Sequence, residues 1–328
     1  MIVITGGAGF IGSNLAAALA ERGEHDVVVC DRLGDDDKWR NLSKHDIAKT
    51  VSPEDLPDFL NDNETAVETI FHMGAISSTT ETDAGLLKAE NFDTSMNLWR
   101  WCTAQNARLI YASSAATYGD GSQGFDDEAT PEALAKLRPL NLYGRSKHLF
   151  DRRVVRFVED GEPCPRQWAG LKFFNVYGPN EYHKGAMQSI VAKNHAKAAR
   201  GETITLFKSH HPDYVDGGQL RDFISVVDCV AVMLWLYDNP EVSGLFNLGT
   251  GKARSFADLV AALFAALGRE AAIDYVDTPL EIRDNYQYFT QAKMGRLRAA
   301  GYTAPFLSLE DGVADYVVNY LNKDDPYR

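Results

Sequence analysis

A glycine-rich turn at the start of the chain limits the possible folds more than any other feature. A short β-branched stretch, Ile2–Thr5, leads into Gly6-Gly7-Ala8-Gly9-Phe10-Ile11-Gly12, and residues 11–22 then carry apolar side chains at helical spacing. Glycines in this pattern allow a tight turn, a close approach of backbone to a pyrophosphate, and tight packing of a helix on a strand. The N–H groups at the helix start suit phosphate oxygens. With a strand before it and a helix after it, the turn predicts a dinucleotide site.

The rest of the first half alternates between short β-branched runs and helical patterns. Strands are expected at residues 26–30, 69–72, 108–113, 169–174, 204–207 and 245–248, and an exposed polar loop at 209–220. This alternation indicates an α/β fold, a Rossmann-type doubly wound parallel sheet. We expect residues 1–174 to form the dinucleotide-binding Rossmann domain. Residues 175–328 are expected to form a smaller α/β C-terminal substrate lobe, from which about residues 215–250 return to the Rossmann domain.

The end of the second expected strand bears on the choice of cofactor. Asp31 lies about 20 residues after the glycines, where a carboxylate can hold a ribose 2′-hydroxyl, as in NAD sites. Arg32 and Lys38 are close by and could instead hold the 2′-phosphate of NADP. They could equally be solvated charges of an acidic loop. These residues alone leave NAD and NADP equally open.

A tyrosine and a lysine, Tyr143 and Lys147, indicate the chemistry. Their i,i+4 spacing puts both on one face of a helix. A tyrosine hydroxyl is a weak base at neutral pH, but a neighbouring ammonium and a positive nicotinamide ring both favour the phenolate. Tyr143 could then remove or return a carbinol proton while hydride moves. Ser114 follows an expected strand, at the edge where ligands bind parallel sheets, and could hydrogen-bond the reacting oxygen.

Composition narrows the classes of partner. The formal net charge of −13 disfavours nucleic-acid binding, which needs a basic face. No run of about 18 apolar residues predicts a membrane span. Four scattered cysteines and the absence of a basic leader favour a reducing compartment, and we expect a cytoplasmic protein. His183, without a second histidine at ligand spacing, predicts no metal site.

Together the glycine turn, the strand-end serines and the Tyr143–Lys147 pair resemble the extended short-chain dehydrogenase/reductase family, most of whose members act on nucleotide-sugars. The resemblance extends over the whole chain, through Phe71-His72-Met73-Gly74-Ala75, Asn91, Phe174-Asn175-Val176-Tyr177-Gly178-Pro179 and Arg221-Asp222-Phe223-Ile224. Sugar dehydratases of this family carry an Asp-Glu pair after the strand-end serine, where this chain has Ala115 and Ala116. Dehydration is therefore not expected.

Further segments resemble the group of this family that inverts C6 of ADP-bound heptose for the inner core of lipopolysaccharide. They include Ser77-Ser78-Thr79-Thr80-Glu81 and Glu181-Tyr182-His183-Lys184-Gly185-Ala186-Met187. The group is described with NADP, so the resemblance favours NADP, with NAD possible. It departs at Pro53, where the group places a lysine near the NADP phosphate, and in the longer loop at 209–220. A UDP-hexose 4-epimerase and a non-catalytic dinucleotide sensor are the alternatives. Family members form homo-oligomers, which we expect here as well.

Residue by residue, the resemblance and the motifs give three sets. The catalytic set is Tyr143, Lys184, Lys147 and Ser114, in which Lys184 is a second acid/base group or else a cation that binds diphosphate or ribose. The cofactor set is Gly6, Gly9, Phe10, Ile11, Gly12, Asp31, Arg32, Lys38, Met73, Gly74, Ala75, Ile76, Ser77, Asn91, Tyr143, Lys147, Val176 and Lys184. The substrate set is Ser77, Ser114, Asn175, Ala186, Lys193, Phe207, Lys208, Ser209, His210, Arg221 and Tyr286.

Overall fold

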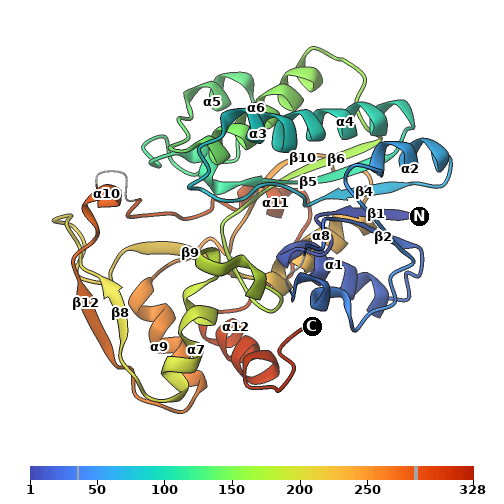
Figure 1. Ribbon diagram of the computed structural model, residues 1–328. Coiled ribbons are helices and arrows are strands. Elements are labelled where there is room, and N and C mark those ends of the chain that lie inside the picture. The colour runs from blue at the N-terminus through green and yellow to red at the C-terminus, as the bar shows by residue number, and fades with distance from the viewer. Residues whose placement is uncertain (35–36, 284–286) are drawn as a thin grey trace.

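A large parallel sheet forms the centre of the computed structural model, which describes residues 1–34, 37–283 and 287–328 (Figure 1). Within those ranges it has seven strands, in the order β10-β6-β5-β4-β1-β2-β3. Their bounds are β1 Ile2–Thr5, β2 Val27–Cys30, β3 Lys49–Val51, β4 Thr69–His72, β5 Arg108–Ser114, β6 Gln167–Phe173 and β10 Gly244–Leu248. All neighbouring strands are parallel. The sequence expectation of a doubly wound parallel sheet is confirmed.

Helices cover both faces of the sheet, which explains why its central strands β1, β2 and β4 are buried at every position. One face carries α2 (Leu56–Asp62), α3 (Ala84–Leu87), α4 (Thr94–Ala104), α5 (Pro131–Lys136) and α6 (Leu142–Glu159), above the sheet in Figure 1. The other face carries α1 (Phe10–Glu21) and α8 (Val226–Asp238), which pack on each other.

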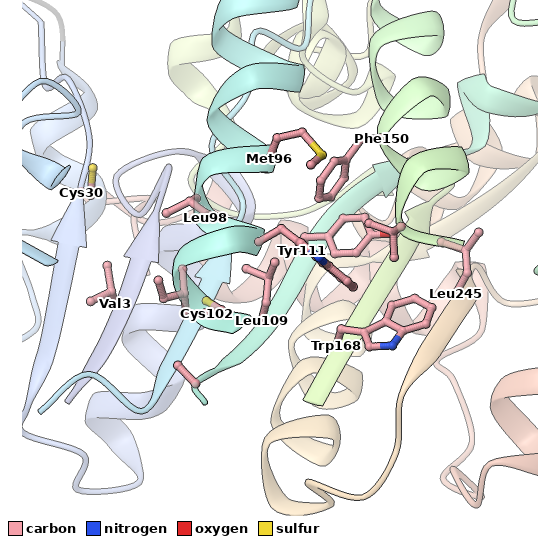
Figure 2. Close-up of a cluster of buried hydrophobic side chains, with 14 of the residues drawn as sticks. Val3, Cys30, Met96, Leu98, Cys102, Leu109, Tyr111, Phe150, Trp168 and Leu245 are labelled. Atoms are coloured by element: carbon pink, nitrogen blue, oxygen red, sulfur yellow. The ribbon is translucent and has the colours of Figure 1, made fainter. Parts of the chain in front are cut away.

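Aromatic side chains fill much of the core between the sheet and the α4–α6 face (Figure 2). The rings of Tyr111 on β5 and Phe150 on α6 meet edge to face, with centroids 4.8 Å apart. Trp99 on α4 meets Trp168 on β6 in the same manner at 5.9 Å. The first contact fixes α6, the helix that carries Tyr143 and Lys147, against β5, and the second fixes α4 against β6.

The remaining elements form a smaller lobe with two short sheets. Strands β7 (Asn175–Tyr177), β9 (Leu220–Ser225) and β11 (Ala253–Ser255) make one, and β8 (Ile204–Phe207) pairs with β12 (Ile273–Val276) in the other. Its main helices are α7 (Ile190–Ala199), α9 (Phe256–Ala266) and α12 (Leu309–Tyr316), with short helices α10 (Leu280–Arg283) and α11 (Gly295–Ala299) elsewhere. The elements that return to the large sheet are α8 and β10. The division at residue 174 stays a prediction.

The expected strands are present, with ends that differ by at most two residues. Five further strands, β3, β7, β9, β11 and β12, were not expected; three of them have only three residues, too short for a periodicity signal. Within the described ranges, no helix combines the length and the apolar character needed to cross a bilayer.

Candidate active site

The glycine turn brings helix α1 against the end of β1 at a distance that excludes side chains. A Cβ atom on Gly12 would lie 2.2 Å from the carbonyl oxygen of Gly6. Gly6 itself has a φ of +65° and faces the backbone of Gly74 across the gap between β1 and β4, so a Cβ there would lie 2.6 Å from the Gly74 Cα. The turn therefore leaves an open cradle over the start of α1.

This cradle fits the diphosphate of a dinucleotide. The N-cap residue of α1 is Gly9, which has no side chain to bond the first N–H groups of the helix. Helix starts of this kind bind phosphate through backbone N–H groups and the helix dipole. The carboxylate of Asp31 accepts a hydrogen bond from the Ala8 N–H at 2.9 Å, which ties the end of β2 to the turn.

One cavity of about 790 Å³ extends from this cradle to the lobe. It brings together nearly all of the expected cofactor residues, all four expected catalytic residues and three of the expected substrate residues. Those lining it are Gly6, Gly9, Phe10, Ile11, Gly12, Asp31, Arg32, Lys38, Met73, Gly74, Ala75, Ile76, Ser77, Ser114, Tyr143, Lys147, Asn175, Val176 and Lys184. Residues 150 positions apart in the sequence thus share one site.

Ion pairs occupy the corner where the second strand ends. The Lys38 ammonium lies 2.6 Å from the Asp31 carboxylate. Arg32 lies 2.6 Å from Glu54 and 3.4 Å from Glu90, and more than half of its side chain is exposed. Exposed pairs of this kind contribute about 0–1 kcal/mol each, so they restrain Arg32 only weakly. Arg32 can therefore exchange a carboxylate for a phosphate at small cost, whereas the pair of Lys38 with Asp31 is mostly buried.

Helix α6 places Tyr143 and Lys147 at the opposite wall. The helix begins where the Asn141 side chain accepts a hydrogen bond from the Gly144 N–H at 2.7 Å. Burial raises the pKa of Tyr143, and a hydrogen bond with the Ser114 side chain counteracts that shift. Ser114 therefore lies beside the phenol, and its expected hydrogen bond to the reacting oxygen stays a prediction.

Lys147 is almost fully buried, and burial lowers its pKa to about 8. Beside it, His72 on β4 is held by Thr5 Oγ1 at 2.6 Å and Ser95 Oγ at 2.9 Å. Burial, and after it the charge of Lys147, lowers the pKa of His72 to about 3. His72 is therefore neutral at physiological pH and leaves Lys147 as the cation of this wall.

Lys184 reaches the cavity from the other side, in the 3₁₀ turn Tyr182–Met187. Its ammonium lies 4.9 Å from the centre of the Phe10 ring, at the start of α1. Burial lowers its pKa, while the nearby Glu181 carboxylate acts in the opposite direction. A lysine with a lowered pKa gives up its proton more readily than an exposed lysine, which suits a role in proton transfer.

Buried amides connect the Lys184 segment to the glycine turn. Asn41 donates to the carbonyls of Ala8 at 2.8 Å and Asn180 at 3.2 Å, and lies 3.3 Å from the His183 ring nitrogen. Asn14 on α1 donates to the Pro179 carbonyl at 2.9 Å. The segment that carries Lys184 is therefore fixed to the cradle by hydrogen bonds.

The remaining expected residues lie away from the cavity wall. Asn91 is fully buried behind it and exchanges two hydrogen bonds with the backbone of Ile76, so it supports the loop. Arg221 lies 5.5 Å over the Phe256 ring, which lines the cavity. Ala186, Lys193, Phe207, Lys208, Ser209 and His210 do not line it. Tyr286 lies outside the described residues.

Three side chains that the sequence analysis missed support the site: His72, Asp151 and Lys172. Asp151 and Lys172 are fully buried and form an ion pair at 2.8 Å. A lysine inside the otherwise apolar stretch Gln167–Phe173 was the available signal, because such a residue needs a buried partner. Within the described ranges, no group of three or more His, Cys, Asp or Glu side chains could hold a metal ion.

Comparison with known proteins agrees with this geometry. The model of the NAD dependent epimerase/dehydratase family matches residues 2–249. The chain therefore belongs to the NAD dependent epimerase/dehydratase family, as the sequence motifs predicted. Members of this class use a nicotinamide dinucleotide, and the glycine cradle fits that group.

Two relatives that match over their full length have the same name. The chain is 50% identical to the ADP-L-glycero-D-manno-heptose-6-epimerase of Nitratidesulfovibrio vulgaris strain Hildenborough and 45% identical to that of Fusobacterium nucleatum, with 100% of each chain covered. Its structure resembles the crystal structure of Helicobacter pylori ADP-L-glycero-D-manno-heptose-6-epimerase, with 29% identity, a TM-score of 0.79, and 97% and 95% of the two chains covered. UDP-N-acetylglucosamine 4-epimerase from Methanobrevibacter ruminantium, at 23% identity and a TM-score of 0.78, shares the fold.

The buried charge of Lys147 should lower the stability of the folded protein, and removal of this charge should raise it. We expect Lys147→Met to raise the free energy of unfolding of the cofactor-free protein at pH 7 by up to about 3 kcal/mol. Because the folded protein releases this proton near pH 8 and the unfolded chain only near pH 10, wild-type stability rises across that interval and the difference shrinks. Urea unfolding at pH 7 and pH 9.5 measures the difference in the free energy of unfolding between the variant and the wild type. Lys197→Met, at an exposed position on α7, is the control, and an equal gain there would contradict the explanation.

Proposed function

We propose that this chain is an isomerase that inverts C6 of ADP-D-glycero-D-manno-heptose to give ADP-L-glycero-D-manno-heptose. The reaction passes through a ketone at C6 by transient oxidation and re-reduction, and supplies the inner core of lipopolysaccharide. The observation that carries the proposal is the single cavity in which Tyr143 and Lys184 approach from different elements beside a dinucleotide cradle. The relatives at 45–50% identity over the full length support the choice of sugar.

Two proton-handling groups suit an inversion. A nicotinamide dinucleotide held in the cradle would supply a hydride acceptor that also returns the hydride, so the reaction would involve no net redox change. In one orientation of the sugar, Tyr143 takes the proton of the C6 hydroxyl, while Ser114 holds the oxygen and Lys147 favours the phenolate. After the ketone has rotated, Lys184 would give a proton to the same oxygen at the opposite face, and exchange with water would return Tyr143 and Lys184 to their starting protonation states. A roomy cavity of about 790 Å³ permits that rotation.

The cofactor we propose is NADP. Arg32 and Lys38 would hold the 2′-phosphate, since a bidentate arginine–phosphate contact is stronger than the half-exposed pair that Arg32 makes with Glu54. Asp31, bound to Lys38, would then lose its ammonium partner and keep the Ala8 N–H. The cytoplasm and a homo-oligomeric state, both expected from the sequence, stay predictions.

An assay of the purified protein with both sugar classes tests the activity. We expect turnover of ADP-D-glycero-D-manno-heptose and none of UDP-galactose, followed by NMR at the inverted carbon. Tyr143→Phe should lower kcat by about 10²–10⁴-fold with its cofactor retained, because the acid/base group is removed and the cradle is intact. Turnover of UDP-galactose would favour a 4-epimerase. A fully active Tyr143→Phe would exclude the tyrosine mechanism.

Lys184 has a test of its own. Lys184→Met should lower kcat by about 10²–10⁴-fold and leave cofactor content unchanged, since one of the two proton transfers is lost. A role as a diphosphate-binding cation would instead raise KM with kcat preserved. Steady-state kinetics separate the two outcomes, and Lys197→Met on α7 controls for the loss of a positive charge in the same lobe.

The cofactor choice is tested by releasing the bound cofactor from denatured protein and measuring its mass. We expect NADP. Arg32→Ala should weaken NADP about tenfold, through loss of the phosphate contact, and leave NAD affinity unchanged. Glu54→Gln should strengthen NADP, because it removes a competing carboxylate. NAD as the released species, with no effect of Arg32→Ala, would contradict the proposal.

A further inference from the structure

A buried ion pair lies directly behind the Ser114–Tyr143 contact. Asp151 on α6 and Lys172 on β6 are both completely buried, with 2.8 Å between the carboxylate and the ammonium. The Lys172 ammonium also lies 5.0 Å from the centre of the Tyr118 ring. The proposed reaction as described above uses neither group.

This ion pair makes hydrogen bonds to Ser113 and Thr117, which precede and follow Ser114 in the sequence. On one side the Ser113 hydroxyl donates to Asp151 at 2.6 Å. On the other, Lys172 donates to the Thr117 hydroxyl at 2.7 Å, and that hydroxyl donates to the Ser114 carbonyl at 2.8 Å. The backbone of Ser114 is therefore held at two neighbouring points by one ion pair.

The same pair holds the helix that carries the tyrosine. Asp151 follows Tyr143 and Lys147 at successive four-residue steps on α6, so all three share one face of the helix. Tyr111 on β5 adds a second hydrogen bond to Asp151 at 3.2 Å. Asp151 thus joins α6 to β5, the two elements that bring Tyr143 and Ser114 together.

Stability is a poor explanation for such a pair. Replacing a buried ion pair by apolar side chains of similar volume is often neutral or stabilising, because desolvation offsets the attraction. We propose that Asp151 and Lys172 are positioning residues that align Ser114 with Tyr143 and Lys147 for proton transfer. This inference rests on the proposed function for its kinetic consequence alone.

Charge supports the geometry. The titratable groups whose charges couple to Lys147 are Asp151 from α6 and the neutral His72 from β4, and Tyr143 lies one helical turn before Lys147 on α6. Asp151 is the group whose charge opposes the effect of burial on the pKa of Lys147 and keeps the ammonium protonated. Neutralising Asp151 should therefore release the Lys147 proton at lower pH.

The double variant Asp151→Asn/Lys172→Met tests this without leaving an unpaired buried charge. We expect kcat to fall roughly tenfold to hundredfold, since small misplacements of reacting groups have effects of this size. KM and cofactor content should stay near wild type, because neither residue lines the cavity. The matched control is Arg22→Gln/Asp238→Asn, which removes an ion pair between α1 and α8 on the far face of the sheet and should leave kcat unchanged.

A second readout needs no substrate. The pH dependence of acetic anhydride labelling at Lys147, followed by mass spectrometry, should have a midpoint near 8 in the wild type and a lower one in the double variant. A kcat within twofold of wild type would overturn the proposal. A fall in kcat accompanied by an equally large rise in KM and an equally large loss of cofactor binding would also overturn it. So would an unchanged labelling midpoint. If wild type turns over no sugar, the proposed function fails, while the labelling still decides whether Asp151 controls Lys147.

Discussion

The close approach of α1 to β1 is the constraint on which the rest of the site depends. With 2.2 Å between the Gly6 carbonyl and the place where a Cβ of Gly12 would lie, only glycine permits the contact. That contact sets the direction of α1 and leaves its first N–H groups facing the cavity. Asn14 and Asn41 then fix the position of the backbone around residue 180 by hydrogen bonds to its carbonyl groups. Lys184, in the other lobe, is positioned relative to the cradle for this reason.

Burial, more than the identity of the neighbours, sets the chemistry of the polar groups. It lowers the pKa of Lys147, His72 and Lys184 and raises that of Tyr143. Carboxylates act in the opposite direction on the two lysines, Asp151 on Lys147 and Glu181 on Lys184. The site therefore holds two lysines whose protonation depends on one nearby acid each, at opposite walls of one cavity.

The sequence predicted what local patterns encode. The glycine turn, the pair at Tyr143 and Lys147, and the long buried strands each have a signal within a few residues. The ion pair of Asp151 with Lys172 and the contacts of His72 join residues from 21 to 67 positions apart, so no local spacing reveals them. For the same reason, the pairing of Arg32 with Glu54 was not expected. Residues such as Phe207 and Lys208 were placed by resemblance alone, and in this structure they lie outside the cavity wall.

The edge strand β10 has a consequence for how the chain is made. It completes the sheet beside β6 about 70 residues after β6 has been synthesised. The Gln167 side chain at the start of β6 likewise donates hydrogen bonds to residues that are synthesised later, at the carbonyls of Leu236, Asn239 and Val242. Until those residues leave the ribosome, β6 presents an unpaired edge and an uncovered apolar face, the condition under which strands aggregate. At about 5–20 residues per second, the nascent dinucleotide half would expose this edge for several seconds of translation.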